Sequence, residues 1–363
     1  MFVAWRDLKF AKGRFALMGT VIVLITLLVG LLSGLTAGLG RQNTSAITGL
    51  PADRIAFQAP RGGGDLSYAD STVTERQWRR WAAAPGVEGA EPLGITTTKA
   101  IAGDRSGGVS AFGVRPGSRL APEGANIDDH AAVLSATAAD DLGVRTGDSF
   151  ALAGQRLRVA AVAGDAFFSH TPVVWTSLDV WRKAAPPAAG GADGPTATVI
   201  ALNTTPEADV TALDEQAGTR TVATDDSLSA IGSYTSENGS LQLMRGFLFA
   251  ISALVIGAFF TVWTIQRSGD VAVLKALGAS TAGLLKDALG QALVLLVGGT
   301  VIGTGVAAAL GALVAGSAVP FLLTPATVLL PAAVMVLLGA LGAALSIRRI
   351  TSVDPLTALG SAR

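Results

Sequence analysis

Side chains that could carry out catalysis are few in this chain, and their spacing does not favour it. There is no cysteine and there are only two histidines, His130 and His170, which excludes disulfides and thiolate chemistry and argues against a multi-histidine metal site. Asp128 and Asp129 are adjacent, so their carboxylates point apart and suit a solvated loop better than an acid–base pair. No Gly-x-x-x-x-Gly-Lys-Ser/Thr loop, His-Glu-x-x-His or Gly-x-Ser-x-Gly motif occurs. The sequence therefore predicts a protein that is not an enzyme.

The composition places the chain in the membrane class. Of its 363 residues 50% are hydrophobic and 15% are charged, and the apolar residues are clustered into long uncharged runs. A helix rises about 1.5 Å per residue, so about 20 residues cross the bilayer core. A signal peptide is the alternative for the first run, but its core would be only roughly 7–15 residues long. The sequence thus predicts four transmembrane helices, at 15–40, 246–266, 288–318 and 326–347.

The distribution of basic residues predicts the orientation in the cell (plasma) membrane. Lys and Arg occur in segment 1–14, in segment 267–287 and in the tail 348–363, whereas the connection 320–325 has none. Because basic short loops stay on the inner side, both termini should be cytoplasmic. Segment 1–14 is also a candidate amphipathic helix on the inner surface of the bilayer. The zero net charge gives no basic footprint for nucleic acid.

Residues 41–240 form a different kind of chain, polar and rich in Gly, Pro, Thr and Asp. Short β-type runs bounded by turn residues alternate there with short helical candidates. This predicts a large extracytoplasmic α+β domain with its own core, inserted between the first and second transmembrane helices. The predicted strands are 54–58, 95–101, 109–114, 132–135, 157–162, 173–175 and 198–202, and the predicted helices are 74–84, 137–142 and 206–216.

Three glycines lie four residues apart on one face of the first predicted span: Gly30, Gly34 and Gly38. Small residues at this spacing let two helix backbones approach closely in a membrane. We expect this face to bring two copies of the chain together, through their first and second spans, as a homodimer.

The segment 267–287 is polar and amphipathic and lies between two uncharged runs. On a helix, Leu274, Leu277 and Gly278 fall on one face, so a short helix here could lie at the membrane surface and contact a soluble partner. Gly278 followed by Ser280 predicts a helix end and a new start, because Gly suits the left-handed C′ position and Ser the N-cap. On the residues alone, an ordinary interfacial loop helix is an equally good interpretation.

The run R-x-x-D-V-A-V-L-K-A-L-G-A-S in this segment resembles the cytoplasmic coupling segment of the FtsX/MacB-type permeases of ABC transporters. Segment 132–165 resembles part of the extracytoplasmic domain of that family, and the tail 348–363 resembles its C-terminal P-x-x-A-L end. The resemblance implies a permease that works as two copies with two copies of a separate ABC ATPase. The residues that it implies for the ATPase contact are Asp270, Leu274, Lys275, Leu277 and Gly278.

The first third of the chain carries a narrower resemblance. The runs MFVAWRDLKFAKGRF and LSGLTAGLG are similar to the start of the haem-exporter permeases of the HrtB type, with Asp7 in place of Glu and Thr36 in place of Ala. This resemblance implies efflux and detoxification of haem or a similar amphiphile, with haem as the transported substrate and no permanently bound cofactor.

The candidate substrate site follows from that chemistry. The predicted spans contain no ionisable side chain, which argues against a polar path and suits a lipophilic substrate that enters from the bilayer. Tyr, His and Met can face a haem iron, and Arg can pair with the propionates. Each residue also has a plainer interpretation, as an interfacial belt, lipid-facing, core or surface side chain. The candidate substrate-binding residues are Tyr234, Glu237, Met244, Arg41 and Arg245, together with Phe168 and His170 of the aromatic stretch 167–170.

Two other functions remain open from the sequence. One is an FtsX-like mechanotransmission subunit that controls an extracytoplasmic partner such as a cell-wall hydrolase or a sensor. The other is a membrane-anchored structural protein, which would have no use for the coupling segment.

Overall fold

Four long helices carry the uncharged runs: α2 (Lys12–Thr48), α7 (Tyr234–Gln266), α9 (Thr281–Val314) and α10 (Pro325–Thr351). Each is long and apolar enough to cross a membrane. Helix α2 continues past the predicted end at residue 40, and α7 begins before the predicted start at residue 246. These extra turns contain polar side chains such as Asn43 and Glu237, so they do not belong to an uncharged run.

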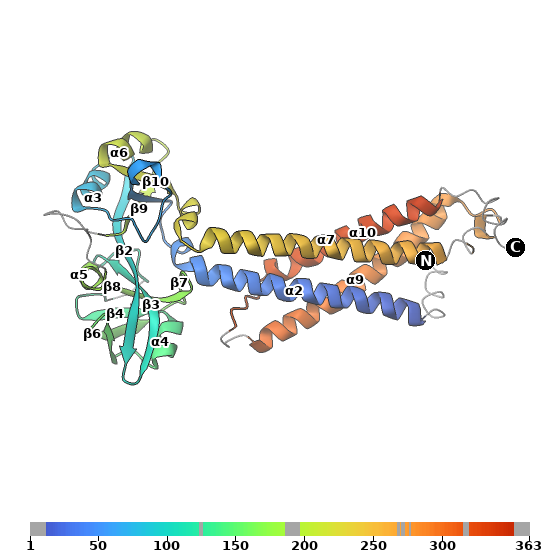
Figure 1. Cartoon of the computed structure of the whole chain (residues 1–363), viewed down its shortest axis with the longest axis horizontal. Helices are drawn as coiled ribbons and strands as arrows, with labels where there is room; N and C mark the ends of the chain where they lie inside the picture. Colours follow the sequence, from blue (N-terminus) through green and yellow to red (C-terminus); the bar gives the residue numbers. More distant parts are fainter. Residues whose placement is uncertain are drawn as a thin grey trace. The chain divides into compact units, whose positions relative to one another are not determined.

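The computed structural model describes residues 12–122, 126–185, 197–266, 269, 273–275, 277–314 and 319–351 (Figure 1). They divide into two units, each with its own packing. One is the sheet domain, Leu39–Asn238, and the other, here called the helical unit, consists of the residues on either side of it. Segment 1–11, the end of the third predicted span (315–318), Asp270 and the tail 352–363 lie outside the described residues.

The glycine face of α2 is filled from within the same chain. A Cβ on Gly30 would lie 2.9 Å from the Cβ of Ala307 on α9, and a Cβ on Gly34 or Gly38 would collide with Phe321 or Pro320. The backbone N–H of Leu322 also donates to the Gly34 carbonyl, at 3.0 Å. This corrects the expectation that these glycines join two copies. The connection between α9 and α10 folds back onto them, and the spacing alone could not say which backbone would approach.

The rest of the helical unit packs through the same kind of close contact. Gly299 and Gly303 of α9 lie against Ile22 and Val23 of α2. On the opposite side the Thr261 and Ser346 hydroxyls of α7 and α10 are 2.9 Å apart. The buried apolar side chains of this unit include Phe15, Met18, Ile22, Val29, Ile256, Phe260, Trp263, Leu296 and Met335.

The sheet domain is built on one mixed sheet of ten strands, in the order β10-β1-β9-β2-β3-β8-β4-β6-β5, with β7 paired to β8. Strands β3 and β8, and strands β4 and β6, pair in parallel. Since β5 pairs with both β6 and β2, strands β2, β3, β8, β4, β6 and β5 close into a ring. The strands are β1 (Arg54–Gln58), β2 (Val87–Ala102), β3 (Arg105–Val114), β4 (Ala131–Leu134), β5 (Ser149–Leu152), β6 (Gln155–Val162), β7 (Phe167–Phe168), β8 (Thr171–Ser177), β9 (Val199–Thr204) and β10 (Thr219–Ala223).

Short capped helices cover this sheet. Thr74 begins α3 (Glu75–Ala82) with a reciprocal capping box to Gln77, and Ser135 and Ser177 cap the next two helices. The sequence did not predict the helix Leu178–Ala184 or the strands β5, β7 and β10. The helices of this domain are α3, α4 (Ala136–Leu142), α5 (Leu178–Ala184) and α6 (Val210–Ala217), with 3₁₀ turns η1 (Arg61–Gly63) and η2 (Asp226–Ala230).

Candidate functional site

Two of the predicted substrate residues meet in the sheet domain. His170 lies in the turn between β7 and β8, and Glu237 lies in the first turn of α7. The imidazole Nε2 of His170 is 2.8 Å from Glu237 Oε2, and the side chains are 32% and 41% exposed. Residues distant in sequence thus form one ionisable pair that solvent can reach.

Asn43 of α2 completes this cluster, and the sequence analysis did not single it out. Its Nδ2 donates to Glu237 Oε2 at 2.9 Å and lies 3.4 Å from Ser233 Oγ. The side chain is buried (3% exposed), and its Oδ1 has no hydrogen-bond partner among the described residues. The signal was present as the polar run R-Q-N-T-S that follows the first uncharged run. An amide buried among carboxylate and hydroxyl groups orients the Glu237 side chain.

Arg41 is already paired within the sheet domain. Its guanidinium lies 3.4 Å from Asp165 Oδ2 and 3.3 Å from the Asp165 carbonyl oxygen. The other carboxylate oxygen of Asp165 accepts from the Thr137 hydroxyl at 2.8 Å. The Arg41 and Asp165 side chains are both partly exposed and their ion pair is weak, so another anion could replace Asp165 as the partner of Arg41.

Phe168 belongs to the core rather than to the surface. It is 6% exposed, as is Phe167, and its ring packs edge-on against Tyr68 (5.4 Å between centroids) and Phe112 (5.8 Å). This corrects the expectation of an accessible aromatic patch at 167–170. Strand β7 turns both rings inward, and an aromatic pair in a short strand gives no indication of which side faces solvent.

The remaining predicted substrate residues lie on α7. Tyr234 is the first residue of the helix, half-buried against the main core of the sheet domain. Met244 and Arg245 belong to the helical unit, where Met244 is 49% exposed. The described structure therefore brings together His170 and Glu237. Arg41 lies two residues before Asn43 on α2 and bonds to Asp165 instead, and Met244 and Arg245 belong to the other unit.

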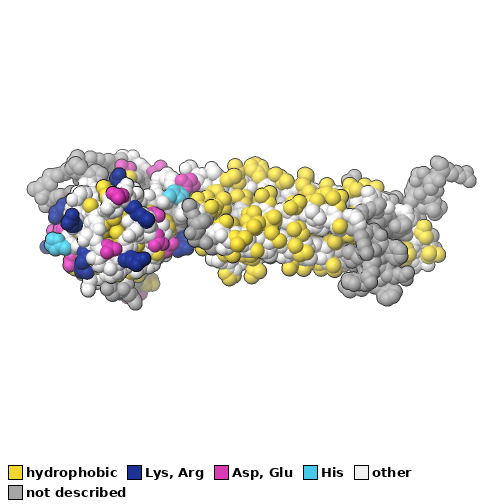
Figure 2. Space-filling model, turned by 90° about the horizontal axis from the view of Figure 1, so that it is seen from below, with side chains coloured by type: hydrophobic (Ala, Val, Ile, Leu, Met, Phe, Trp, Pro, Cys, Tyr) yellow, Lys and Arg dark blue, Asp and Glu magenta, His cyan; other side chains and the backbone are white. Residues whose placement is uncertain are grey.

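The outer surface of the helical unit is apolar, and hydrophobic side chains spread over it (Figure 2). On α7 the exposed residues recur at helical spacing along one face, which suits contact with lipid or with another helix. They are Leu243, Phe247, Ile251, Leu254, Val262 and Ile265, each more than half exposed.

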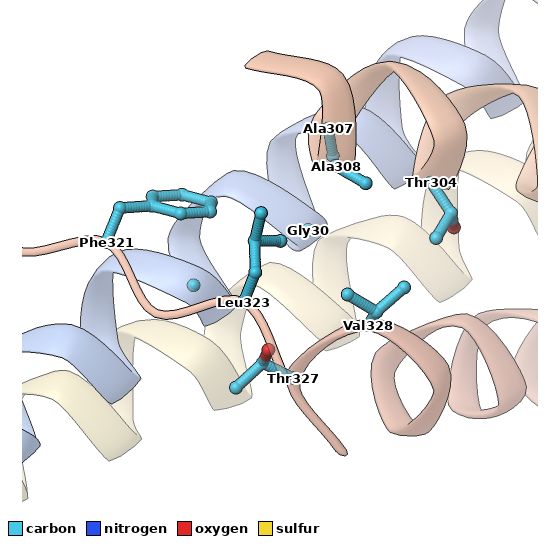
Figure 3. A pocket seen from close by; sticks show the side chains of 9 residues that line it. Gly30, Thr304, Ala307, Ala308, Phe321, Leu323, Thr327 and Val328 are labelled. Carbon is cyan, nitrogen blue, oxygen red and sulfur yellow. The ribbon is translucent and has the colours of Figure 1, made fainter. Parts of the chain in front are cut away.

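A small pocket lies between α2, α9 and the connection to α10 (Figure 3). It is lined by Gly30 and Gly34, by Thr304, and by Phe321 and Thr327 among others. Its volume of about 10 Å³ is near the least that holds one water molecule. A flat amphiphile the size of a porphyrin cannot enter it as it stands.

The predicted helix end and restart are present in segment 267–287. Gly278 has a φ of 92°, its N–H donates to the Lys275 carbonyl, and the N–H of Ala279 reaches back to the Leu274 carbonyl. This is the Schellman arrangement that Gly at C′ favours. The Ser280 hydroxyl then accepts from the Gly283 N–H at 3.2 Å and caps α9. Leu274 and Leu277 are 42% and 79% exposed, so this turn presents apolar side chains outward.

Comparisons with known proteins agree with this architecture. The model of the MacB-like periplasmic core domain matches residues 15–220, and the model of the FtsX-like permease C-terminal region matches residues 243–355. These matches and the four membrane helices flanking one α+β domain define the class: this chain belongs to the FtsX/MacB-type permeases of ABC transporters. It is a multi-pass plasma membrane protein of the ABC transporter permease class.

Several relatives match this chain over nearly the whole length of both proteins. A putative hemin transport system permease protein HrtB of Staphylococcus haemolyticus is 25% identical, covering 99% of this chain and 99% of the relative. The protein of that name from Staphylococcus epidermidis is 24% identical over 99% of both chains. An uncharacterized ABC transporter permease of Mycobacterium tuberculosis is 26% identical, again over 99% of both.

Solved structures of extracytoplasmic regions align with about half of this chain. The periplasmic region of MacB from Actinobacillus actinomycetemcomitans gives a TM-score of 0.36 at 11% identity and covers 50% of this chain and 92% of its own. The extracellular domain of the noncanonic ABC-type transporter YknZ from Gram-positive bacteria gives 0.35 at 12% identity, with 47% and 98% covered.

Proposed function

We propose that this permease exports haem or a similar amphiphile from the membrane, driven by ATP hydrolysis on a separate ATPase subunit. The observation that carries the proposal is the full-length similarity to relatives named as putative hemin transport permeases. The apolar surface of α7 supports it, because a lipophilic substrate can reach such a surface from the bilayer. The uncharged spans give an ion no comparable route.

The substrate residues of this proposal centre on α7. Tyr234 or Met244 faces the iron, since Tyr and Met can each be an axial ligand, and Arg245 is one candidate partner for the propionates. Arg41 is a second propionate partner, which must exchange its bond to Asp165 for one to the substrate. Glu237 and His170 border the site as a pair. Phe168 contributes only by supporting the turn that carries His170, since its ring is buried.

The experiment is an absorbance titration of the purified full-length permease with haemin. Wild type should give a bound-haem spectrum, and the double variant Tyr234→Ala/Met244→Ala should lose it. His130→Ala is the matched control, because His130 is the histidine that is not a candidate site residue. This variant should bind haemin like wild type. Wild-type protein that gives no bound spectrum, or a double variant with unchanged affinity, contradicts this site.

The orientation is a second part of the proposal: both termini and the coupling segment are cytoplasmic, and the sheet domain is outside. The chain has no native cysteine, so single cysteines report cleanly. An impermeant thiol reagent on whole cells should label Ser106→Cys, in the sheet domain, and spare Ser280→Cys. The reverse labelling pattern would refute the orientation.

A mechanotransmission role is the second candidate, and the attachment of helix ends to the sheet domain favours it. The end of α2 and the start of α7 both bond to the β7–β8 turn, so a shift of either helix end can move the strands. Growth of a deletion strain separates the two functions. Sensitivity to toxic haemin supports export, whereas normal haemin tolerance with a cell-wall separation defect supports control of a hydrolase.

A further inference from the structure

The end of α2 holds the β7–β8 turn through backbone hydrogen bonds. The backbone N–H groups of Ser169 and His170 donate to the carbonyls of Asn43 and Gln42, at 3.0 and 2.9 Å. Both turn residues adopt positive φ angles, 49° and 64°. Left-handed backbone is unfavourable for residues other than glycine, and it persists where the surroundings hold it in place. The turn is therefore a strained element held by a defined set of bonds.

The same turn also reaches α7 through one carboxylate oxygen. Glu237 Oε2 lies 2.8 Å from His170 Nε2 and accepts from Asn43 Nδ2 at 2.9 Å. The Asn43 amide that donates to Glu237 does not titrate. The His170 bond changes with the charge of the imidazole, and histidine ordinarily changes charge between about pH 5 and pH 8.

The other charged side chains near this turn are paired with each other. Arg41 on α2 and Asp165 in the loop before β7 bond to one another at 3.4 Å. Tyr68 contacts the turn from the core through Phe168, and burial raises the pKa of its phenol, which stays neutral. The side chain one turn before Glu237 on α7 is the phenol of Tyr234. Glu237 is thus the charged side chain that hydrogen-bonds the imidazole.

We propose that His170 and Glu237 form a proton-sensitive latch that holds the first turn of α7 to the β7–β8 turn. When the imidazole is protonated, its charge attracts the carboxylate and the latch is closed. When it loses the proton, the Asn43 bond remains and the ionic attraction is gone. The ionic part of the latch is therefore present when the imidazole is charged and absent when it is neutral. The latch does not depend on the identity of the substrate.

Hydrogen–deuterium exchange on the full chain in lipid nanodiscs tests the latch. The peptides to follow contain residues 167–171 and 234–238, at about pH 5 and about pH 8, with rates corrected for the intrinsic pH dependence of exchange. Partly exposed ion pairs are weak, so protection of both peptides should fall about two- to fivefold at the higher pH. Under the same correction a peptide from β1, which has no histidine contact, should show constant protection.

Two variants test whether the pH response depends on the latch, and a third variant is the control. His170→Gln keeps a hydrogen-bonding side chain that does not titrate, and its protection should be the same at both pH values. Glu237→Gln keeps His170 and removes the carboxylate charge, so its protection should also be the same at both pH values. This variant replaces His170→Gln if that protein folds poorly. His130→Gln is the matched control and should respond like wild type. A wild-type protein with no pH response, or a response that survives in His170→Gln or Glu237→Gln, overturns the latch.

Discussion

Helix α2 is held by different means in the two units of this protein. In the helical unit its contacts depend on shape: glycines admit Ala307, Pro320 and Phe321. The hydroxyls of Thr26 and Ser33 are buried there without a hydrogen-bond partner among the described residues. In the sheet domain the same helix is held by directed hydrogen bonds: Asn43 Nδ2 donates to Glu237, and Ser45 Oγ accepts from the Phe167 N–H.

The difference follows from the surroundings of each part. Lipid gives helices no hydrophobic reason to associate, so close van der Waals contact between small residues decides which faces meet. In a water-exposed domain, backbone groups that become buried must find partners, and side chains at helix ends supply them. One helix can therefore carry two sequence signals, glycine spacing in one half and polar residues in the other.

The largest expected effect lies in the core of the sheet domain. Trp81 is fully buried and its Nε1 donates to the Thr219 hydroxyl at 3.1 Å. Trp81→Ala should lower the free energy of unfolding by about 3–5 kcal/mol, because it leaves a cavity. Pulse proteolysis of the full chain in denaturant measures this loss. The control is Trp78→Ala, a half-buried neighbour on α3, and equal effects of the two substitutions would contradict the assignment of Trp81 to the core.

Gly38→Ala should have the next largest effect, in the helical unit. The added methyl collides with the backbone carbonyl of Pro320, which cannot rotate away as a side chain could. Overpacking of this kind costs about 1–3 kcal/mol. The matched control is Gly298→Ala on α9, where nothing lies within 4 Å of the added atom. Thermal unfolding in detergent should separate the two variants, and identical midpoints would mean that shape is not what holds α2.

Ser45→Ala tests the directed bonds of α2 in the sheet domain. It leaves the Phe167 N–H, now bonded to Ser45 Oγ at 2.9 Å, without that acceptor. The expected loss is about 1–2 kcal/mol in the free energy of unfolding. Ser229→Ala, which removes an exposed hydroxyl, is the control. A loss no greater than the control's would show that this bond contributes little to the attachment.

The smallest effect on stability is expected at Leu277, whose side chain is 79% exposed. Leu277→Asp should leave insertion and unfolding unchanged. It should nevertheless abolish stimulation of the partner ATPase, because a charge would be desolvated in an apolar docking groove. Pull-down of the ATPase and its hydrolysis rate measure the effect. Wild-type binding and transport by this variant would remove Leu277 from the docking surface.

Local signals were read correctly from the sequence, and contacts between distant residues were not. The uncharged runs identified the membrane helices, and Gly278 with Ser280 marked a helix end and start that capping geometry explains. Helix α5 was missed because it begins directly after β8 with no turn residue between them, and β10 because only Thr219 of its five residues is buried, so it has no apolar alternation.

The candidate site divides in the same way. Glu237 and His170 were selected separately by residue type, and only the fold shows that they touch. Asn43 was missed because the polar run R-Q-N-T-S does not show which of its side chains becomes buried. Phe168 was misplaced because residue type does not say which way a two-residue strand faces. The glycine spacing on α2 correctly predicted a close approach. The approaching groups are Ala307, Pro320 and Phe321 of the same chain rather than a second copy.

The edges of the sheet have a consequence for crowding. Many copies of a membrane protein share one plane, so their outer domains collide far more often in matching orientations than freely tumbling proteins do. An open strand edge would then invite strand exchange and polymerisation. Here β5 is closed onto β2, and at the other end of the sheet the Asp214 carboxylate accepts from the Thr221 N–H at 2.8 Å, blocking the outer edge of β10. The domain can therefore be packed densely on a cell surface without its sheets joining.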